Sequence, residues 1–320
     1  MQITSAIHRL LRREPLDEDD STQLWSAILD DAVDGPELGA VVAALAARGE
    51  TREELRGLYR ATRERLAHWS PAVAGDAIAI PAYGLVAGES LIVALAATLL
   101  RKFGLPVVIH GVLDSPCGVS SACVLRELGI LPCASLAQAE ERLGAEGAAF
   151  LPVQLLSPAF AALIALRGRL GIENSAHLVA QALDPTLGLA TRLTFCVEGT
   201  VSERYETAGL EIEGDAVSLA WRAGRTPLNL AIRPRIERVR AGAREPLFEA
   251  DSQETRTALA PPPEDAPGIA RWIERATSGA VPVPVPAMNL AAACLYAVGR
   301  APDLRQAQAI AAFSAGRLAA

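Results

Sequence analysis

The segment that most constrains the fold of this chain runs from Leu105 to Ile130. It opens with a short apolar run, continues through His110-Gly111 into a polar loop, and ends in a helical pattern. Just upstream, residues 77–81 form another apolar run, followed by a glycine-containing loop and an almost uniformly apolar segment from Glu89 to Phe103. A strand that feeds a helix through a loop is half of a βαβ unit, and a helix that is apolar on all sides is buried. These segments therefore predict the core of an α/β domain, with ligand-binding loops at the strand ends.

Only helical patterns precede this unit. The first helix is expected to bury the apolar residues of its period, which are Ile3, Ile7, Leu10 and Leu11. Gly35-Pro36 is expected to break the pattern before a third helix over residues 38–47. Thr51 and Glu54 have the spacing of a capping box for a fourth helix that reaches His68. Residues 1–68 therefore predict a compact all-helical module.

Strands and helices alternate in the second half of the chain. The strand-like runs are residues 149–153, 192–197, 216–221 and 228–232. The helical patterns are residues 158–170, 174–183, 268–277, 287–298 and 304–318. The VPVPVP run at 281–286 is expected to be extended, because proline lacks an N–H donor and has a fixed φ.

The composition is that of a globular protein, with 51% hydrophobic and 21% charged residues in 320. The net charge of −7 argues against a surface that is positive all over, although it leaves room for a local cationic groove. The five cysteines form no CxxC pair, so we expect free thiols rather than zinc or disulfide frameworks. The polar N-terminus does not resemble a signal peptide, and the apolar run at 90–100 is too short to span a bilayer. We therefore expect a cytoplasmic protein without a membrane partner.

Charge is segregated between two consecutive segments. Between residues 198 and 215, six acidic residues accompany one arginine. The segment from 222 to 244 is cationic, with Glu237 against Arg222, Arg225, Arg233, Arg235, Arg238, Arg240 and Arg244. Such a segment suits a polyanion. The alternative that the sequence leaves open is that these arginines are solvated and pair with the preceding acidic segment, residues 198–215.

Three motifs carry a resemblance to a known enzyme superfamily. They are the loop IPAYGLVAGES, the strand end VIHG followed by a Val-Ser-Ser turn, and the segment LRGRLGIENSAH. In this order, after a helical module, they resemble the anthranilate phosphoribosyltransferase superfamily, which has a nucleoside-phosphorylase-like fold and is usually homodimeric. The resemblance implies an α/β fold class, with a helical domain hinged to an α/β domain that has a mixed central sheet. It implies a helical domain of residues 1–70 with 155–188 packed onto it, and an α/β domain of residues 71–154 and 189–320.

The chain departs from the enzymes at each motif. The first loop lacks the paired glycines and the aspartate of their GTGGDG pattern, and His110-Gly111 lacks the flanking lysine, asparagine and arginine. Glu173-Asn174 stands where the enzymes carry Arg-Thr, and WRAGRT at 221–226 has arginines where they hold magnesium with carboxylates. Each lost transition-state contact is worth roughly a few kcal/mol, so the departures argue against ordinary catalysis.

A divergent branch, the YbiB-type proteins, shares residues 106–112, 168–180 and 270–284 more closely. That resemblance implies a homodimer that binds nucleic acid, DNA or RNA, without sequence preference and without transferase activity. The alternative is a transferase that moves phosphoribose from phosphoribosyl pyrophosphate to anthranilate or another aromatic amine or base, with magnesium. A scaffold that has lost both activities is the third hypothesis.

The candidate residues follow from these resemblances. We assign no catalytic residue and no metal ligand, and we expect no cofactor unless the transferase alternative holds. The residues expected to contact phosphate groups of nucleic acid are Arg167, Arg169, Arg222, Arg225, Arg233, Arg235 and Arg238. The residues expected to line a remnant of the sugar-phosphate pocket are Tyr83, Gly84, Gly88, His110, Gly111, Ser120, Ser121, Asn174 and His177. The structural alternatives are a strand-end His110 bonded to backbone, helix caps for the serines, and packing for His177.

Overall fold

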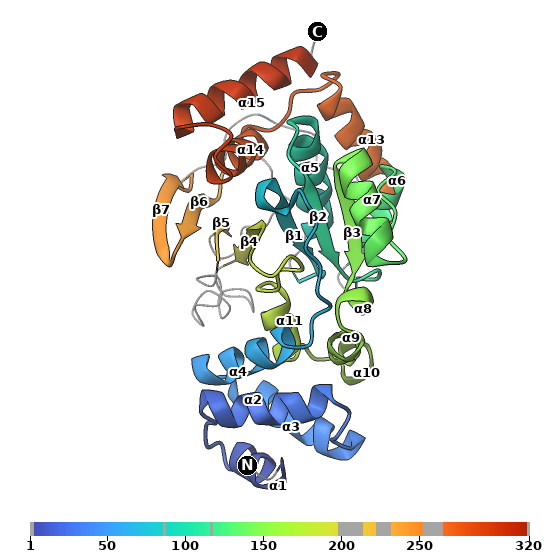
Figure 1. Cartoon of the computed structure of the whole chain (residues 1–320), viewed down its shortest axis with the longest axis vertical. Helices are drawn as coiled ribbons and strands as arrows, with labels where there is room; N and C mark the ends of the chain where they lie inside the picture. Colours follow the sequence, from blue (N-terminus) through green and yellow to red (C-terminus); the bar gives the residue numbers. More distant parts are fainter. Residues whose placement is uncertain are drawn as a thin grey trace.

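The computed structural model describes residues 3–85, 88–115, 118–197, 214–221, 232–251 and 265–318. Figure 1 shows a helical layer at one end of the molecule and a sheet covered by helices above it. The helical layer begins with α1 (Ile3–Leu11), α2 (Glu18–Leu29), α3 (Gly35–Arg48) and α4 (Arg52–Arg63). It is completed from later in the chain by α9 (Pro158–Ala165) and α11 (Ser175–Ala180), which share its buried apolar cluster. The domain boundaries themselves stay a prediction.

Helix caps explain where these helices begin. Thr51 and Glu54 form the expected capping box, with the Thr51 N–H donating to Glu54 at 2.8 Å. Gly35-Pro36 does not break the pattern as predicted, because Asp34 caps α3 and proline is tolerated in a first turn. The prediction for Leu11 was also wrong, since its side chain is 59% exposed. α4 ends at Arg63, five residues before the predicted end.

The central sheet has seven strands in the order β3-β2-β1-β4-β5-β6-β7. The strands are β1 (Ile78–Ala82), β2 (Val107–Gly111), β3 (Ala148–Pro152), β4 (Thr191–Val197), β5 (Ala216–Trp221), β6 (Arg235–Arg240) and β7 (Ala243–Phe248). Strands β1 to β5 pair in parallel. Strand β6 pairs antiparallel with both of its neighbours, β5 and β7. The sheet is therefore mixed, and the predicted fold class is confirmed.

The two faces of the sheet bury different clusters, because alternate residues of a strand point to opposite faces. Ile78, Ile109 and Phe150 belong to the larger cluster. That cluster includes α5 (Glu89–Lys102), α6 (Ser121–Glu127), α13 (Ala266–Thr277), α14 (Val285–Ala297) and α15 (Leu304–Leu318). Ala79 and Val108 face a smaller cluster with α7 (Leu136–Glu146). The carboxyl ends of β1 and β2 are adjacent, so the loops that follow them meet at one edge.

Several later elements differ from the prediction. The expected helix over 158–170 is divided into α9 and α10 (Arg167–Leu170). α7, α8 (Val153–Leu156), β6 and β7 were not predicted, and most of the run 228–232 lies outside the described residues. The proline run is not extended to its end, because α14 begins at Val285 with a proline in its first turn.

Candidate functional site

The loop after β1 holds an internal carboxylate. The Glu89 side chain accepts hydrogen bonds from the backbone N–H groups of Gly84 and Leu85, at 2.7 and 2.9 Å. Glu89 is 2% exposed, and as the first residue of α5 it lies at the positive end of the helix dipole. N–H groups at the start of a helix are a common binding site for phosphate. Here the carboxylate of the first helical residue instead accepts two N–H groups of the loop that precedes the helix.

Gly84 and Gly111 bring the loops after β1 and β2 together. Gly84 has a φ of 70°, and a Cβ on it would lie 2.6 Å from the Ser115 hydroxyl oxygen. A Cβ on Gly111 would overlap the carbonyl oxygen of Ala82. The backbones therefore approach as closely as glycine allows. Gly88, with a φ of 81°, caps α5.

Tyr83 and His110 form a buried pair between these two loops. The Tyr83 hydroxyl lies 2.9 Å from His110 Nδ1, so the histidine contacts a side chain rather than the backbone. Burial and the nearby positive charge of Arg192 lower the pKa of His110 to about 3. Burial, together with the negative charge of Glu89, raises the pKa of Tyr83. Both side chains are therefore neutral near pH 7, which suits a packed pair better than a phosphate clamp.

The two serines act as parts of a helix start. Ser120 is the N-cap of α6, and its hydroxyl oxygen accepts a hydrogen bond from the Cys123 N–H at 3.2 Å. Ser121 is the first helical residue and is 6% exposed. Ser120 therefore caps the helix, as the structural alternative predicts, and Ser121 is buried in its first turn.

Asn174 and His177 close the start of α11 in the same way. The Asn174 side chain accepts a hydrogen bond from the Ala176 N–H at 3.0 Å, and His177 Nδ1 accepts one from the Asn174 N–H at 3.2 Å. Burial and the positive charge of Arg167 lower the pKa of His177 to about 4. The Ser175 hydroxyl donates to the Glu50 carboxylate at 2.7 Å. The first residue of α11 is thus also hydrogen-bonded, through its side chain, to a carboxylate of the same chain.

The arginines before α11 are in different environments. Arg167 forms an ion pair with Glu173 at 2.9 Å, and its side chain is 19% exposed. Arg169 is exposed. Of the pair, Arg169 is the one accessible to an external anion.

The described part of the predicted cationic segment leads into an edge ribbon of β6 and β7, and its arginines form ion pairs. Arg233 contacts Asp251 at 2.8 Å, Arg235 contacts Glu237 at 3.4 Å, and Arg238 contacts Glu245 at 2.6 Å. Arg238 also lies over the ring of Tyr296. The partners of these three arginines lie outside the acidic segment 198–215, whereas Arg240 contacts Asp215 of that segment at 3.7 Å. Arg222 and Arg225 lie outside the described residues.

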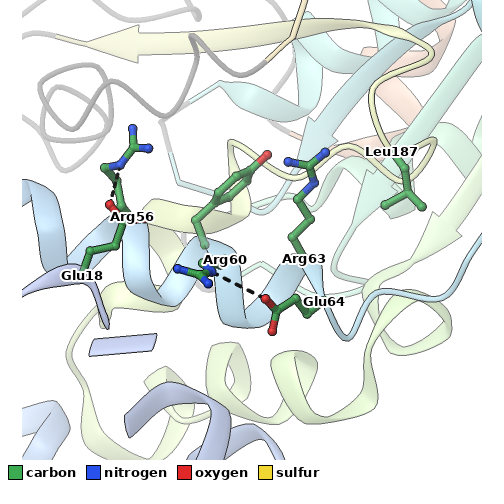
Figure 2. A pocket seen from close by; sticks show the side chains of 7 residues that line it. Glu18, Arg56, Arg60, Arg63, Glu64 and Leu187 are labelled. Carbon is green, nitrogen blue, oxygen red and sulfur yellow. Dashed lines mark hydrogen bonds and ion pairs between the residues drawn. The ribbon is translucent and has the colours of Figure 1, made fainter. Parts of the chain in front are cut away.

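A cavity of about 450 Å³ lies along α4. Its lining consists of Glu18, Arg56, Tyr59, Arg60, Arg63, Glu64 and Leu187. Figure 2 shows Arg56 and Arg63 projecting to the same side of α4, with Leu187 reaching the cavity from the loop after α11. Arg56 contacts Glu18 at 3.0 Å, and Arg60 contacts Glu64 at 3.6 Å.

Comparison with known proteins identifies the family. Residues 4–66 match the helical bundle domain of the glycosyl transferase family. The uncharacterized protein YbiB of Escherichia coli (strain K12) is 31% identical over 289 residues, which cover 89% of this chain and 90% of YbiB. The chain belongs to the anthranilate phosphoribosyltransferase-like glycosyl transferase family 3 superfamily, as a YbiB homologue.

Other members of the superfamily agree with the fold. Anthranilate phosphoribosyltransferase of Gluconobacter oxydans is 34% identical over 159 residues, covering 49% of this chain and 43% of that enzyme. The crystal structure of the Thermus thermophilus enzyme aligns with a TM-score of 0.72 at 20% identity, covering 98% of this chain and 97% of that one. The Saccharomyces cerevisiae enzyme in complex with PRPP and Mg aligns with a TM-score of 0.73 at 12% identity, covering 99% and 94%. These structural likenesses concern the fold alone.

Several notable residues of this YbiB homologue were missed by the sequence analysis. Glu89 was treated only as a helix start, although an acidic first residue after a glycine is a signal for a capping carboxylate. The four-residue spacing of Arg52, Arg56 and Arg60 predicts one cationic helix face. Arg192 is buried and donates to the Ala182 carbonyl at 2.8 Å. Nothing in the sequence of its strand indicates that this arginine is buried.

The described part of this superfamily member contains neither a metal-binding cluster nor a membrane-spanning helix. Among those residues, no group of three or more His, Cys, Asp or Glu side chains is placed to hold a metal ion. The segment 222–226, which was expected to carry arginines in place of the magnesium carboxylates, is outside that part. None of the helices described is both long and apolar enough to cross a membrane.

Proposed function

We propose that this protein binds nucleic acid, DNA in the first instance, without sequence preference, on a phosphoribosyltransferase fold that no longer transfers phosphoribose. The observation that carries the proposal is the Glu89 carboxylate, which accepts the Gly84 and Leu85 N–H groups. A diphosphate brought to this loop would meet a buried negative charge, because those N–H donors are already used. Such like-charge contact in a site with little water is unfavourable.

Two further carboxylates have the same effect on the remnant pocket. Glu50 accepts the Ser175 hydroxyl, and Glu173 pairs with Arg167. An incoming sugar phosphate would have to displace each of them. Both contacts are only partly buried, with exposures of 19% for Arg167 and 26% for Glu173, so they oppose an incoming phosphate less strongly than the buried Glu89 does.

The ribbon arginines suit a polyanion better. Arg233 and its partner Asp251 are 29% and 28% exposed, and Arg235 is 43% exposed, whereas its partner Glu237 is 10% exposed and also pairs with Arg244 at 2.9 Å. Exposed ion pairs contribute only about 0–1 kcal/mol, so a phosphodiester can replace the carboxylate at small cost. Release of counterions from the nucleic acid then favours binding at low salt. Arg169 adds an exposed cation on α10.

The test is binding of fluorescent single- and double-stranded DNA of two sequences across a salt series. We expect binding that is insensitive to sequence and that weakens with salt. The double variant Arg233→Ala/Arg235→Ala should lower the log–log salt slope by about 1.8, since each phosphate contact contributes roughly 0.9. Arg271→Ala/Arg275→Ala on α13 removes the same charge from exposed positions elsewhere and is the matched control. Equal slopes for the two variants, or no binding at low salt, would count against the proposal.

The transferase alternative is favoured by the curated relatives that carry the enzyme's name over about half of this chain. Its test is magnesium-dependent release of pyrophosphate from phosphoribosyl pyrophosphate and anthranilate. We expect no release above background. Release that scales with protein concentration would establish the alternative. The homodimer and the cytoplasmic location stay predictions, to be measured by sedimentation velocity and cell fractionation.

A further inference from the structure

The segment that joins α10 to α11 presents apolar side chains beside a cation. Residues 168–172, which we call the α10 tip, are all exposed. Leu170 is 45% exposed and Ile172 is 38% exposed, and Arg169 comes directly before Leu170. A single exposed apolar residue is ordinary on a protein surface, whereas neighbouring ones bordered by polar groups are a feature of interaction sites. The tip is therefore a candidate contact surface.

The backbone of the α10 tip is held at both ends. Gly171 ends α10 with a φ of 71°, and its N–H donates to the Arg167 carbonyl at 2.9 Å. The Arg167 side chain forms an ion pair with Glu173 at 2.9 Å, which joins the two ends of the tip. The Asn174 side chain donates to the Leu163 carbonyl at 2.7 Å and fixes the start of α11. A preorganised tip loses little conformational entropy when a ligand binds to it.

The charge of this segment favours an anionic partner. Residues 166–174 contain two arginines and one glutamate, so the segment carries one positive charge in excess. The glutamate is the partner of Arg167, and Arg169 is the more exposed of the two arginines. A further carboxylate of the region, Glu50, is hydrogen-bonded to Ser175 beyond the tip. An anion that approaches the tip therefore meets Arg169 first.

A nucleic acid combines the two chemistries that the tip presents. Its phosphates suit arginine, and its bases have apolar faces. Leucine and isoleucine side chains of DNA-binding proteins enter the step between two bases and unstack it. A second copy of the chain suits the tip less well, because two partly exposed side chains cover far less than the roughly 800 Å² that each partner buries in a stable interface.

We propose that the α10 tip contacts the bases of a nucleic acid, with Leu170 and Ile172 entering a base step and Arg169 contacting the adjacent phosphate. This inference rests on the proposed function and adds a contact that unstacks bases to one that binds only the backbone. The ribbon of β6 and β7 and helix α10 lie on opposite sides of the molecule in the view of Figure 1, so the tip is a contact separate from the ribbon.

The experiment uses a single-stranded oligonucleotide with one 2-aminopurine, a base whose fluorescence rises when it is unstacked. We expect the emission to rise when the full chain binds at low salt. Leu170→Ser/Ile172→Ser should lose this increase and weaken binding about tenfold, with an unchanged salt slope, because apolar contacts release no counterions. Both positions are exposed, so the variant should keep the melting temperature of the natural protein.

Three further variants separate the tip from other contacts. Leu11→Ser/Leu131→Ser changes two leucines that are 59% and 43% exposed elsewhere, and it should keep both the affinity and the emission increase. Arg169→Ala should lower the log–log salt slope by about 0.7, the value for one phosphate of a single strand. Arg233→Ala/Arg235→Ala should weaken binding and leave the emission of the bound oligonucleotide unchanged.

The outcomes distinguish this inference from the proposed function. Binding without an emission increase, or an increase that Leu170→Ser/Ile172→Ser retains, would overturn the inference and leave the proposed function in place. Absence of binding to any oligonucleotide would overturn both. Sedimentation velocity and flotation with phosphatidylglycerol vesicles test the other partners. A dimer or a vesicle complex that this variant loses, with its emission increase intact, would assign the tip to a second copy or a membrane and overturn the proposal.

Discussion

The loops after β1 and β2 and the face of α4 treat anionic groups in opposite ways. In the loops, the N–H groups of Gly84 and Leu85 bind a carboxylate from the same chain, and the site is buried. On α4, guanidinium groups line an open cavity and are oriented by carboxylates at its edge. The loops after β1 and β2 therefore bind an anionic group of their own chain. The face of α4 instead combines guanidinium groups and carboxylates around an open cavity.

The difference is one of burial as much as of charge. A buried carboxylate that loses its donors, or donors that lose their carboxylate, leave polar groups without water to replace the contact. An exposed ion pair exchanges its partner at little cost. A buried internal glutamate is thus harder to displace by an external anion than a carboxylate in an exposed ion pair.

We call the loops after β1 and β2, with Gly84, Leu85, Glu89 and Gly111, the closed region. The substitution with the largest expected effect there is Gly111→Ala. The added Cβ would overlap the Ala82 carbonyl oxygen, so the strands β1 and β2 must separate. We expect the free energy of unfolding to fall by at least about 3 kcal/mol, at the upper end for overpacking. Urea denaturation measures it, with Gly168→Ala as control, because nothing lies within 4 Å of a Cβ at Gly168. A Gly111→Ala protein as stable as the control would show that the loops are not tightly joined.

Glu89→Ala should open the closed region. Two partly buried N–H groups lose their acceptor, which we expect to cost about 1–2 kcal/mol in urea denaturation. Inorganic phosphate should recover part of the loss in the variant and not in the natural protein, since a ligand that binds the folded state raises stability by mass action. Glu89→Gln, which keeps one oxygen acceptor without the charge, should be intermediate. Lack of any phosphate effect on Glu89→Ala would mean that the carboxylate is a helix cap and not a substitute for an anion.

The sequence predicts local features of this molecule better than distant ones. The residue span of α15 and that of β5 agree with the predicted ones, because hydrophobic period and turn residues define them locally. The ribbon of β6 and β7 was missed, since arginines and prolines obscure its alternation. The division between α9 and α10 has no breaker residue to signal it.

The same distinction holds at the candidate site. The contact of Glu89 with Gly84 joins positions five residues apart, so it could be predicted from the local sequence. The contact of Ser175 with Glu50 joins positions 125 residues apart, which only the folded chain brings together. The approach of Leu187 to α4 is likewise a product of the tertiary fold.

The smallest of the three effects concerns two buried histidines, one at the end of β2 and one on α11. His110 and His177 have pKa values lowered to about 3 and 4, below the value near 6.5 of an unfolded chain. Between about pH 6.5 and pH 4 the unfolded chain therefore binds protons that the folded chain does not. Stability is unaffected by these groups above pH 6.5 and falls as the pH drops through this window, by up to about 1.4 kcal/mol per pH unit for each histidine.

His110→Gln removes one of these groups and keeps an acceptor for the Tyr83 hydroxyl. Denaturation at a series of pH values should show that its stability falls less steeply between pH 6.5 and pH 4, by about 1.4 kcal/mol per unit. His68→Gln, at an exposed position, should keep the natural slope. Because carboxylates titrate alike in all three proteins, the difference in slope isolates His110. Identical slopes would mean that water reaches this histidine, and the contrast between a closed loop region and an open α4 face would then lose its basis.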